Sequence, residues 1–232
     1  MVLGGVQKNS FIDYPGKISC VLFLAGCNFK CPYCHNPELV SPGENCHAFS
    51  DQKWIFEYLK KRKGLLDAVV ISGGEPTLQN GLVTLCDRLK EMGYPIKIDT
   101  NGSRPEMIRR LIQNRLIDYI AMDIKTDPSD YSGIAKTKID PDNILDSIHL
   151  IMDSEIEYEF RTTCIKPLVN ERVIEKISRL IQGSPLYALQ RFREQNVLQP
   201  EFFRDNTAEL TSQELIRLKS IAEQRVRECI VR

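Results

Sequence analysis

Three cysteines within eight residues are the part of this sequence best suited to chemistry. They are Cys27, Cys31 and Cys34, in the run Cys27-Asn28-Phe29-Lys30-Cys31-Pro32-Tyr33-Cys34-His35-Asn36. Such short spacings allow only a tight loop, so the three thiolates can close around one small inorganic body. Four thiolates would suit zinc or a fully ligated iron–sulfur cluster. Three thiolates on a cubane 4Fe–4S cluster leave one iron open to a substrate or cofactor, so the spacing favours a reactive cluster.

Other kinds of site are compatible with the same cysteines. A zinc site could take His35 or Cys46 as its fourth ligand, and a C-x-x-C pair could exchange disulfides. Cys46 lies in a polar stretch without flanking cysteines, which makes a second cluster there the less favoured alternative. The remaining cysteines lie in apolar or amphipathic segments, where we expect them to pack as small hydrophobic side chains: Cys20, Cys86, Cys164 and Cys229.

Length and charge narrow the class of protein. The chain has 232 residues, and 31 basic side chains balance 31 acidic ones, so no broad attraction to nucleic acid or anionic membranes is expected. No apolar run reaches the roughly 20 residues of a membrane-spanning helix. Residues 1–10 lack the charged start and apolar core of a signal peptide. We expect a cytoplasmic protein that contacts neither nucleic acid nor membrane.

The elements that must position the cysteines alternate along the chain. Apolar, β-branched runs predict strands at 18–24, 68–72, 96–99, 119–124, 158–165 and 187–189. Helical spacing of apolar residues predicts helices at 51–63, 82–93, 105–114, 143–152, 171–181 and 211–230. Strands that alternate with helices indicate an α/β fold with a parallel sheet and right-handed crossovers. Periodicity alone does not decide between an open sheet and an incomplete (β/α) barrel.

Polar residues collect where the predicted strands end. After the cysteine loop come Gly73-Gly74-Glu75, Asp99-Thr100-Asn101-Gly102, Asp123-Ile124-Lys125, Arg161 and Gln190. Ligands of parallel α/β folds bind beyond the carboxyl ends of the strands, so these residues are candidates for one site. Taken singly, the glycines could form simple turns, Asp123 and Lys125 an ordinary ion pair, and Arg161 a surface residue.

Taken together, these motifs resemble the radical S-adenosylmethionine (SAM) enzymes. The C-x-x-x-C-x-x-C pattern matches at Cys27, Cys31 and Cys34 with Tyr33 before the third cysteine, and the glycine-glycine-glutamate motif matches at Gly73-Gly74-Glu75. The resemblance covers roughly residues 10–190 and implies a partial (β/α)6 barrel. We accordingly expect a single domain over 1–232, with a core at about 16–190 and a C-terminal loop and helix at 191–232.

The resemblance also implies roles for individual residues. The three cysteines would hold one 4Fe–4S cluster, whose open iron would be chelated by the amino and carboxylate groups of SAM. The residues expected to contact SAM are Tyr33, Asn36, Gly73, Gly74, Glu75, Asp99, Asn101, Lys125 and Arg161. Asp99, Thr100 and Asp123 would match a monovalent-cation site beside it. The activase of pyruvate formate-lyase, a member of this family, has a histidine at the position of Gln190. One SAM contact of that enzyme therefore has no match in this sequence.

Within the family, the sequence looks most like the activating enzymes of glycyl-radical proteins. Cys34-His35-Asn36 and Asp99-Thr100-Asn101-Gly102 match the activase of pyruvate formate-lyase, and residues 10–17 (SFIDYPGK) resemble the activating protein of anaerobic ribonucleoside-triphosphate reductase. The implied partners are that reductase and a one-electron donor such as flavodoxin or ferredoxin. The alternatives are a radical SAM enzyme for a small molecule, such as 7-carboxy-7-deazaguanine synthase, or for a peptide. A module that only binds zinc or a cluster is the third hypothesis.

Residues 191–210 form the longest irregular segment, with arginines and phenylalanines interspersed. Such a segment is usually a loop whose aromatic side chains turn inward. The sharper hypothesis is a cover over the site or a surface for a partner.

Overall fold

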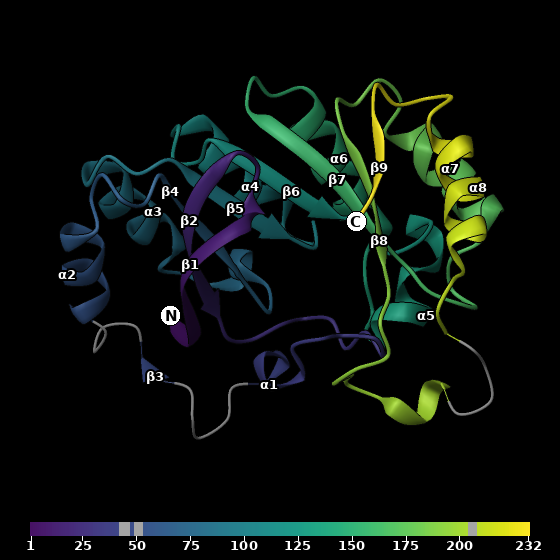
Figure 1. Cartoon of the computed structure of the whole chain (residues 1–232), viewed down its shortest axis with the longest axis horizontal. Helices are drawn as coiled ribbons and strands as arrows, with labels where there is room; N and C mark the ends of the chain where they lie inside the picture. Colours follow the sequence, from purple (N-terminus) through teal and green to yellow (C-terminus); the bar gives the residue numbers. More distant parts are fainter. Residues whose placement is uncertain (42–46, 49–52, 204–207) are drawn as a thin grey trace. The chain divides into compact units, whose positions relative to one another are not determined.

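The computed structural model describes residues 1–41, 47–48, 53–203 and 208–232 (Figure 1). The chain forms two compact units. The first unit consists of Met1–Asn28, Glu38–Thr100 and Glu106–Ile120, and the second of Phe29–Pro37, Asn101–Pro105 and Ala121–Arg232. Cys46 and residues 51–52, where the predicted helix 51–63 begins, lie outside the described residues. The expectation of a single domain stays a prediction.

The first unit is built on a sheet in the order β3-β1-β2-β4-β5. Its strands are β1 (Val2–Tyr14), β2 (Lys17–Leu24), β3 (His47–Ala48), β4 (Ala68–Gly73) and β5 (Ile96–Thr100). Strands β2, β4 and β5 are parallel, whereas β1 is antiparallel to β2 and β3. Residues 68–71 of β4 are completely buried, as expected for a parallel strand with both faces covered.

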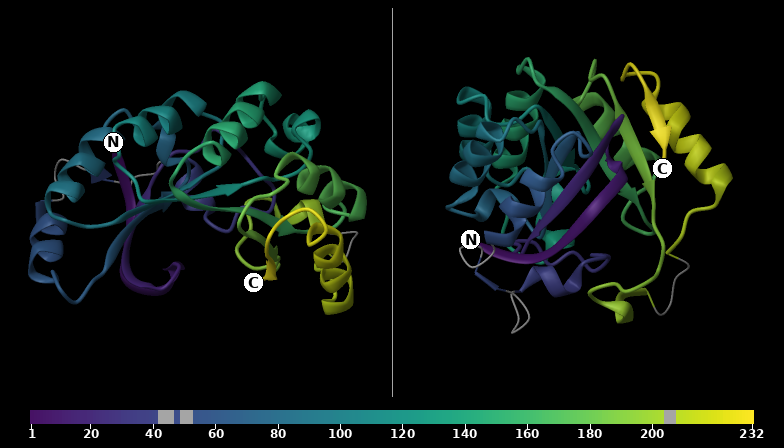
Figure 2. Two further views of the ribbon diagram at one scale, coloured as in Figure 1. Left: turned by 90° about the horizontal axis from the view of Figure 1, so that it is seen from above. Right: turned by 60° about the vertical axis from the view of Figure 1, so that its left-hand side comes forward.

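Helices of the first unit follow the predicted pattern. They are α1 (Pro37–Val40), α2 (Lys53–Lys61), α3 (Leu82–Glu91) and α4 (Pro105–Gln113); the first residues of α1 and α4 belong to the second unit. Figure 2 shows α2, α3 and α4 on one side of the strands of this unit. Helix α3 buries four apolar side chains at helical spacing, which are Leu82, Leu85, Cys86 and Leu89. In α2, Ile55 and Leu59 are buried, but Trp54 is 42% exposed and therefore does not belong to the core.

The second unit contains the parallel strands β7 (Glu157–Cys164), β8 (Tyr187–Arg191) and β9 (Cys229–Val231), in that order. Strand β6 (Tyr119–Asp123) begins in the first unit and ends in the second. The helices are α5 (Tyr131–Ala135), α6 (Pro141–Met152), α7 (Glu171–Leu180) and α8 (Ser212–Ala222). Helices α7 and α8 pack side by side (Figure 1). Thr211 and Glu214 form a capping box at the start of α8.

Several described elements differ from the prediction, and the short elements α1, β3 and α5 were not predicted at all. The predicted last helix ends at Ala222, because the β-branched pair in Cys229-Ile230-Val231 instead forms β9, with Tyr187 paired to Cys229. Residues 2–14 were not predicted as a strand, since glycines and polar residues interrupt their apolar pattern. They nevertheless pair with β2, with register shifts between Leu3 and Gly5 and around Ser10.

Within the part of the chain that the structure describes, no helix combines the length and apolar character needed to cross a bilayer. The four cysteines predicted as packing residues, Cys20, Cys86, Cys164 and Cys229, are all buried.

Candidate active site

The glycine-glycine-glutamate turn lies against the backbone that leads into the cysteine loop. Strands β2 and β4 end in register, with Leu24 opposite Gly73, and Gly74 N–H donates to Leu24 O at 2.8 Å. Glu75 N–H donates to Gly26 O at 2.8 Å, and Gly26 directly precedes Cys27. Gly73 has φ +124°, which favours glycine. A Cβ at Gly74 would lie 2.3 Å from Gly26 O, so this close approach requires a residue without a side chain.

The Glu75 carboxylate is completely buried and holds this turn in place. Its Oε1 accepts hydrogen bonds from Thr77 N at 3.0 Å, from Thr77 Oγ1, and from Thr100 Oγ1 at 2.8 Å. Thr100 ends β5, so one carboxylate oxygen joins the ends of two neighbouring strands. The first unit thus fixes Glu75 through its own donors, and direct contact of Glu75 with SAM stays a prediction.

Asp99 is also paired within the first unit. The Lys97 ammonium forms a short ion pair with Asp99 Oδ1, and the two residues lie two positions apart on one face of β5. The Lys97 side chain is 1% exposed and that of Asp99 14%. Sequence reasoning missed Lys97, although a lysine inside an apolar strand, in step with a candidate acid, was a signal that could have identified it.

In the second unit, Cys31 and Tyr33 are buried together. Burial raises the pKa of the Cys31 thiol to about 11, although the Lys125 charge acts in the opposite direction. Tyr33 is 4% exposed, and among the described residues no hydrogen-bond partner reaches its buried hydroxyl. Buried hydroxyls are normally paired, so this oxygen indicates a polar group that the protein atoms do not supply. Cys34 and Asn36 are partly exposed.

Asp123, Lys125 and Arg161 form one ionic cluster in the second unit. Asp123 Oδ2 accepts from Lys125 Nζ at 2.9 Å, and Asp123 Oδ1 accepts from Arg161 Nε at 2.8 Å. Burial alone would raise the pKa of the Asp123 carboxyl, but Arg161 and Lys125 outweigh it and hold that pKa well below its ordinary value. Burial acts to lower the pKa of Lys125, yet Asp123 holds it well above the usual range. Arg161 is therefore part of this cluster and not the isolated surface residue of the simpler interpretation.

Asn101 begins a turn that leads to α4. Its Oδ1 accepts from Ser103 N at 3.0 Å, and Gly102 O accepts from Ser147 Oγ at 2.6 Å. Gly102 has φ +74°, and a Cβ there would lie 2.1 Å from Met122 Cε. The buried amide of Asn101 is thus positioned by a turn that only glycine fits without strain.

The segment after β8 lies along the cysteine loop within the second unit. Leu198 N donates to Cys34 O at 3.1 Å and Gln199 N to Pro32 O at 3.0 Å. The His35 ring stacks on Phe192 with centroids 5.4 Å apart, and its Nε2 lies 2.9 Å from Arg193 O. Phe192 and Phe203 are buried and in contact, which confirms the inward turn expected of the aromatic residues. With Nε2 beside Arg193 O, His35 could bind zinc only through Nδ1 unless this contact broke.

These residues fit the groups that the resemblance implies. None of the seven described cysteines forms a disulfide, and the chain itself keeps Cys27, Cys31 and Cys34 within eight residues. The buried Tyr33 hydroxyl, which no described residue reaches with a hydrogen bond, is also consistent with a bound cofactor. No set of three or more His, Cys, Asp or Glu side chains among the described residues is arranged around a single metal ion. The ligands of a cubane are spread more widely than those of one zinc ion, whose Zn–S bonds are about 2.3 Å.

The expected monovalent-cation site at Asp99, Thr100 and Asp123 fits the structure less well than the cluster and SAM do. Asp99 and Asp123 are each paired with lysine or arginine from their own unit, and the Thr100 hydroxyl donates to Glu75. The negative charge expected to attract the cation is therefore already balanced by side chains.

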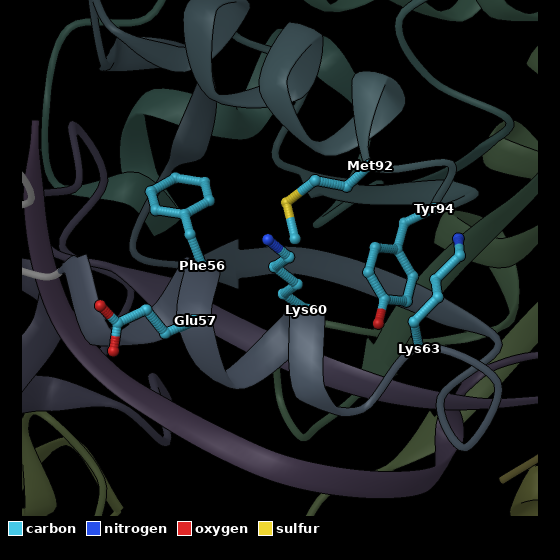
Figure 3. A pocket seen from close by; sticks show the side chains of 6 residues that line it. All are labelled: Phe56, Glu57, Lys60, Lys63, Met92 and Tyr94. Carbon is cyan, nitrogen blue, oxygen red and sulfur yellow. The ribbon is translucent and has the colours of Figure 1, made fainter.

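A separate pocket of about 450 Å³ lies beside α2 (Figure 3). It is lined by Phe56, Glu57, Lys60, Lys63, Met92 and Tyr94, none of which is a candidate site residue.

Comparison with known proteins defines the class. Residues 21–181 match the Radical SAM superfamily, and the chain belongs to this family. The protein is therefore a radical SAM enzyme, a class defined by a 4Fe–4S cluster and SAM. The α/β fold is confirmed, and its parallel-rich sheet is consistent with a partial (β/α)6 barrel.

The chain is similar to several individual proteins whose names state an activity. Over 210 residues the chain is 39% identical to a protein of Methanocaldococcus jannaschii that is provisionally named a glycyl-radical enzyme activating enzyme, covering 87% of this chain and 84% of the relative. A 7-carboxy-7-deazaguanine synthase of Thermococcus kodakarensis is 27% identical over 164 residues, or 61% of this chain and 62% of that one. The solved domain of the pyruvate formate-lyase-activating enzyme of Bacteroides vulgatus is 16% identical, with a TM-score of 0.55, and the match covers 70% of this chain and 98% of that domain. At that identity the solved domain shows the fold alone.

Proposed function

We propose that this protein is a glycyl-radical activating enzyme and that its partner is an anaerobic ribonucleoside-triphosphate reductase. The observation that carries the proposal is the cysteine loop, in which Cys31 and Tyr33 are buried beside the Asp123–Lys125–Arg161 cluster. The 39% identical relative supports the choice of a protein partner. Residues 10–17 support the choice of the reductase, because they resemble its activating protein.

In this proposal, Cys27, Cys31 and Cys34 hold one 4Fe–4S cluster. When bound, such a cluster would supply the single electron for reductive cleavage of SAM, and SAM would supply the group that removes a hydrogen atom from a glycine Cα of the partner. Burial of Cys31 keeps water from its sulfur, and the nearby Lys125 ammonium offsets part of the negative charge that three thiolates bring. The electron comes from an external protein such as flavodoxin or ferredoxin.

The chain's polar groups then orient SAM. The backbone of Gly73 and Gly74 receives the amino group, while Glu75 keeps that backbone in position through Thr77 and Thr100. Lys125 and Arg161 offer N–H donors to the carboxylate of SAM. Asp123 orients both side chains through its ion pairs with them. Asn36, Asn101 and the Tyr33 hydroxyl supply hydrogen bonds to the rest of the cofactor.

The test is electron paramagnetic resonance of an anaerobic mixture of the reduced protein, SAM and the reductase. We expect a glycyl-radical doublet, together with one 5′-deoxyadenosine released for each radical formed. The Cys31→Ala variant is the matched control, and it should give neither signal. SAM cleavage without a doublet would reject the reductase as partner.

The alternative reactions have a different signature. Turnover of a 7-deazapurine precursor or of a peptide, with no second protein present, would favour the small-molecule or peptide hypothesis. If the reduced, cluster-loaded protein did not cleave SAM at all, the proposed activity would be rejected.

A further inference from the structure

A buried lysine lies where the family resemblance places a metal cation. Lys97 is the second residue of β5, and its neighbours Ile96 and Ile98 are apolar and buried. An unpaired ammonium in such surroundings would cost several kcal/mol, so its location requires a compensating charge. The Asp99 carboxylate, two residues further along the same face, supplies that charge.

The remaining surroundings of Lys97 also suit a cation. Its Nζ lies 5.9 Å from the centroid of the Tyr119 ring, within the range of a cation–π interaction. Tyr119 is in turn held by Tyr14, with ring centroids 5.6 Å apart, and both rings are buried. The ammonium is thus fixed between an aromatic face and a carboxylate, and all of these residues belong to the first unit.

Thr100, the neighbouring residue of the expected cation site, is held in place by a side chain of the first unit. Its Oγ1 donates to Glu75 Oε1 at 2.8 Å, which fixes the direction of the hydroxyl. Glu75 Oε1 also accepts from Thr77 N at 3.0 Å, so Thr100 is part of a network fixed by other bonds. The end of β5 therefore has its charge balanced and its hydroxyl oriented by protein atoms alone.

We propose that the Lys97 ammonium takes the place of a bound monovalent cation at Asp99 and positions that carboxylate for SAM. The positioning of Asp99 for SAM rests on the proposed function. The replacement of a cation by Lys97 does not. A protein with a built-in cation should be indifferent to potassium and sodium. Removing the ammonium without removing Asp99 should create a site that an added cation can fill.

The first measurement is the binding of thallium(I), a potassium substitute, to the anaerobic, cluster-loaded protein by thallium nuclear magnetic resonance. We expect no saturable site that potassium can displace in the natural protein or in Lys97→Arg, which retains the charge. Lys97→Met should gain one such site, and the double variant Lys97→Met/Asp99→Asn should lose it again. A potassium-displaceable site in the natural protein, or none in a folded Lys97→Met, would overturn the proposal.

The second measurement is SAM affinity in potassium chloride against tetramethylammonium chloride of equal ionic strength. The natural protein should bind SAM equally in both salts. Lys97→Met should bind about tenfold more weakly in tetramethylammonium and recover in potassium, as expected when a charged hydrogen-bonding partner is lost and replaced. A purely structural ion pair would lower the thermal stability of Lys97→Met without any recovery by potassium, which would refute the inference.

The two measurements separate the possible failures. If the natural protein does not bind SAM, the proposed function is wrong, whereas the thallium experiment still decides whether Lys97 replaces a cation. If Lys97→Met does not fold, the measurements on the natural protein alone test the proposal. Thallium binding that potassium displaces, or SAM affinity that depends on potassium, would contradict it.

Discussion

Replacing Gly74 with alanine tests whether the turn after β4 must touch the backbone before Cys27. The new Cβ would lie 2.3 Å from Gly26 O and 2.9 Å from Leu39 O, whereas ordinary contacts begin at 3.4 Å. The backbone must therefore separate by about 1 Å. Gly26 cannot move freely, because its N–H donates to Leu39 O at 2.7 Å and its carbonyl accepts from Glu75 N. Overpacking of this kind costs about 1–3 kcal/mol of folding free energy.

The functional effect should exceed the effect on stability. A displacement of about 1 Å at a reacting centre can cost about a hundredfold in rate, and we expect that loss in the rate of SAM cleavage. The assay is 5′-deoxyadenosine release by the reduced protein, with iron content and anaerobic urea unfolding measured on the same sample. Gly81→Ala is the matched control, since its Cβ would meet only Met1 at 3.5 Å and Gly81 has φ −86°. Unchanged cleavage by Gly74→Ala, or an equal loss in Gly81→Ala, would refute the reasoning.

Three further predictions concern the second unit and the buried thiols. Cys31→Ala should lose the cluster, seen as loss of brown colour and iron; a full complement of iron would contradict its assignment as a ligand. Asp123 ionises at lower pH in the folded protein than the ordinary value of about 3.9, so its contribution to stability is complete above that pH and is lost as the pH falls toward its depressed pKa. Asp123→Asn should therefore be less stable than the natural protein at pH 7, and the difference should shrink in acid; a constant difference from pH 7 to pH 2 in urea unfolding would contradict this cause. Burial raises the pKa of Cys86 and Cys164 to about 12, so in the folded protein iodoacetamide at pH 8 should leave both unmodified, and mass spectrometry showing rapid labelling would disprove their burial.

Sequence reasoning succeeded where one local pattern determines the structure. The strand around Val70 is an apolar run that ends in glycine, and the strands around Ile98 and Phe160 contain β-branched and aromatic residues between polar ones; the structure has strands at all three positions. The helices of residues 82–91 and 171–180 follow from apolar spacing, because only one face of each is buried. The family was identified correctly because cysteine spacing is set by the cluster and not by the surrounding fold.

Sequence reasoning failed where the structure of a segment depends on residues distant in the chain. Strand β9 is a strand because Tyr187 and its neighbours offer an unpaired edge, which no pattern within residues 229–231 reveals. Strand β1 likewise depends on its partner β2. The pairing of Asp123 with Arg161 needed coordinates, since the two residues lie on different strands and sequence spacing indicates only that each is near a strand end. How each candidate residue contacts SAM stays a prediction.

The hydrogen bonds from Leu198 and Gln199 to the cysteine loop have a consequence for biosynthesis. His35 and Arg193 are separated by 158 positions in the chain, so the ribosome must translate most of the message before the partner of this loop exists. At roughly 10 residues per second, the nascent thiols wait about a quarter of a minute. During that interval Pro32 and Cys34 lack the backbone hydrogen bonds that Gln199 and Leu198 later donate. Iron loaded during translation would therefore enter a half-finished loop, and cellular maturation factors should act most efficiently on the released polypeptide.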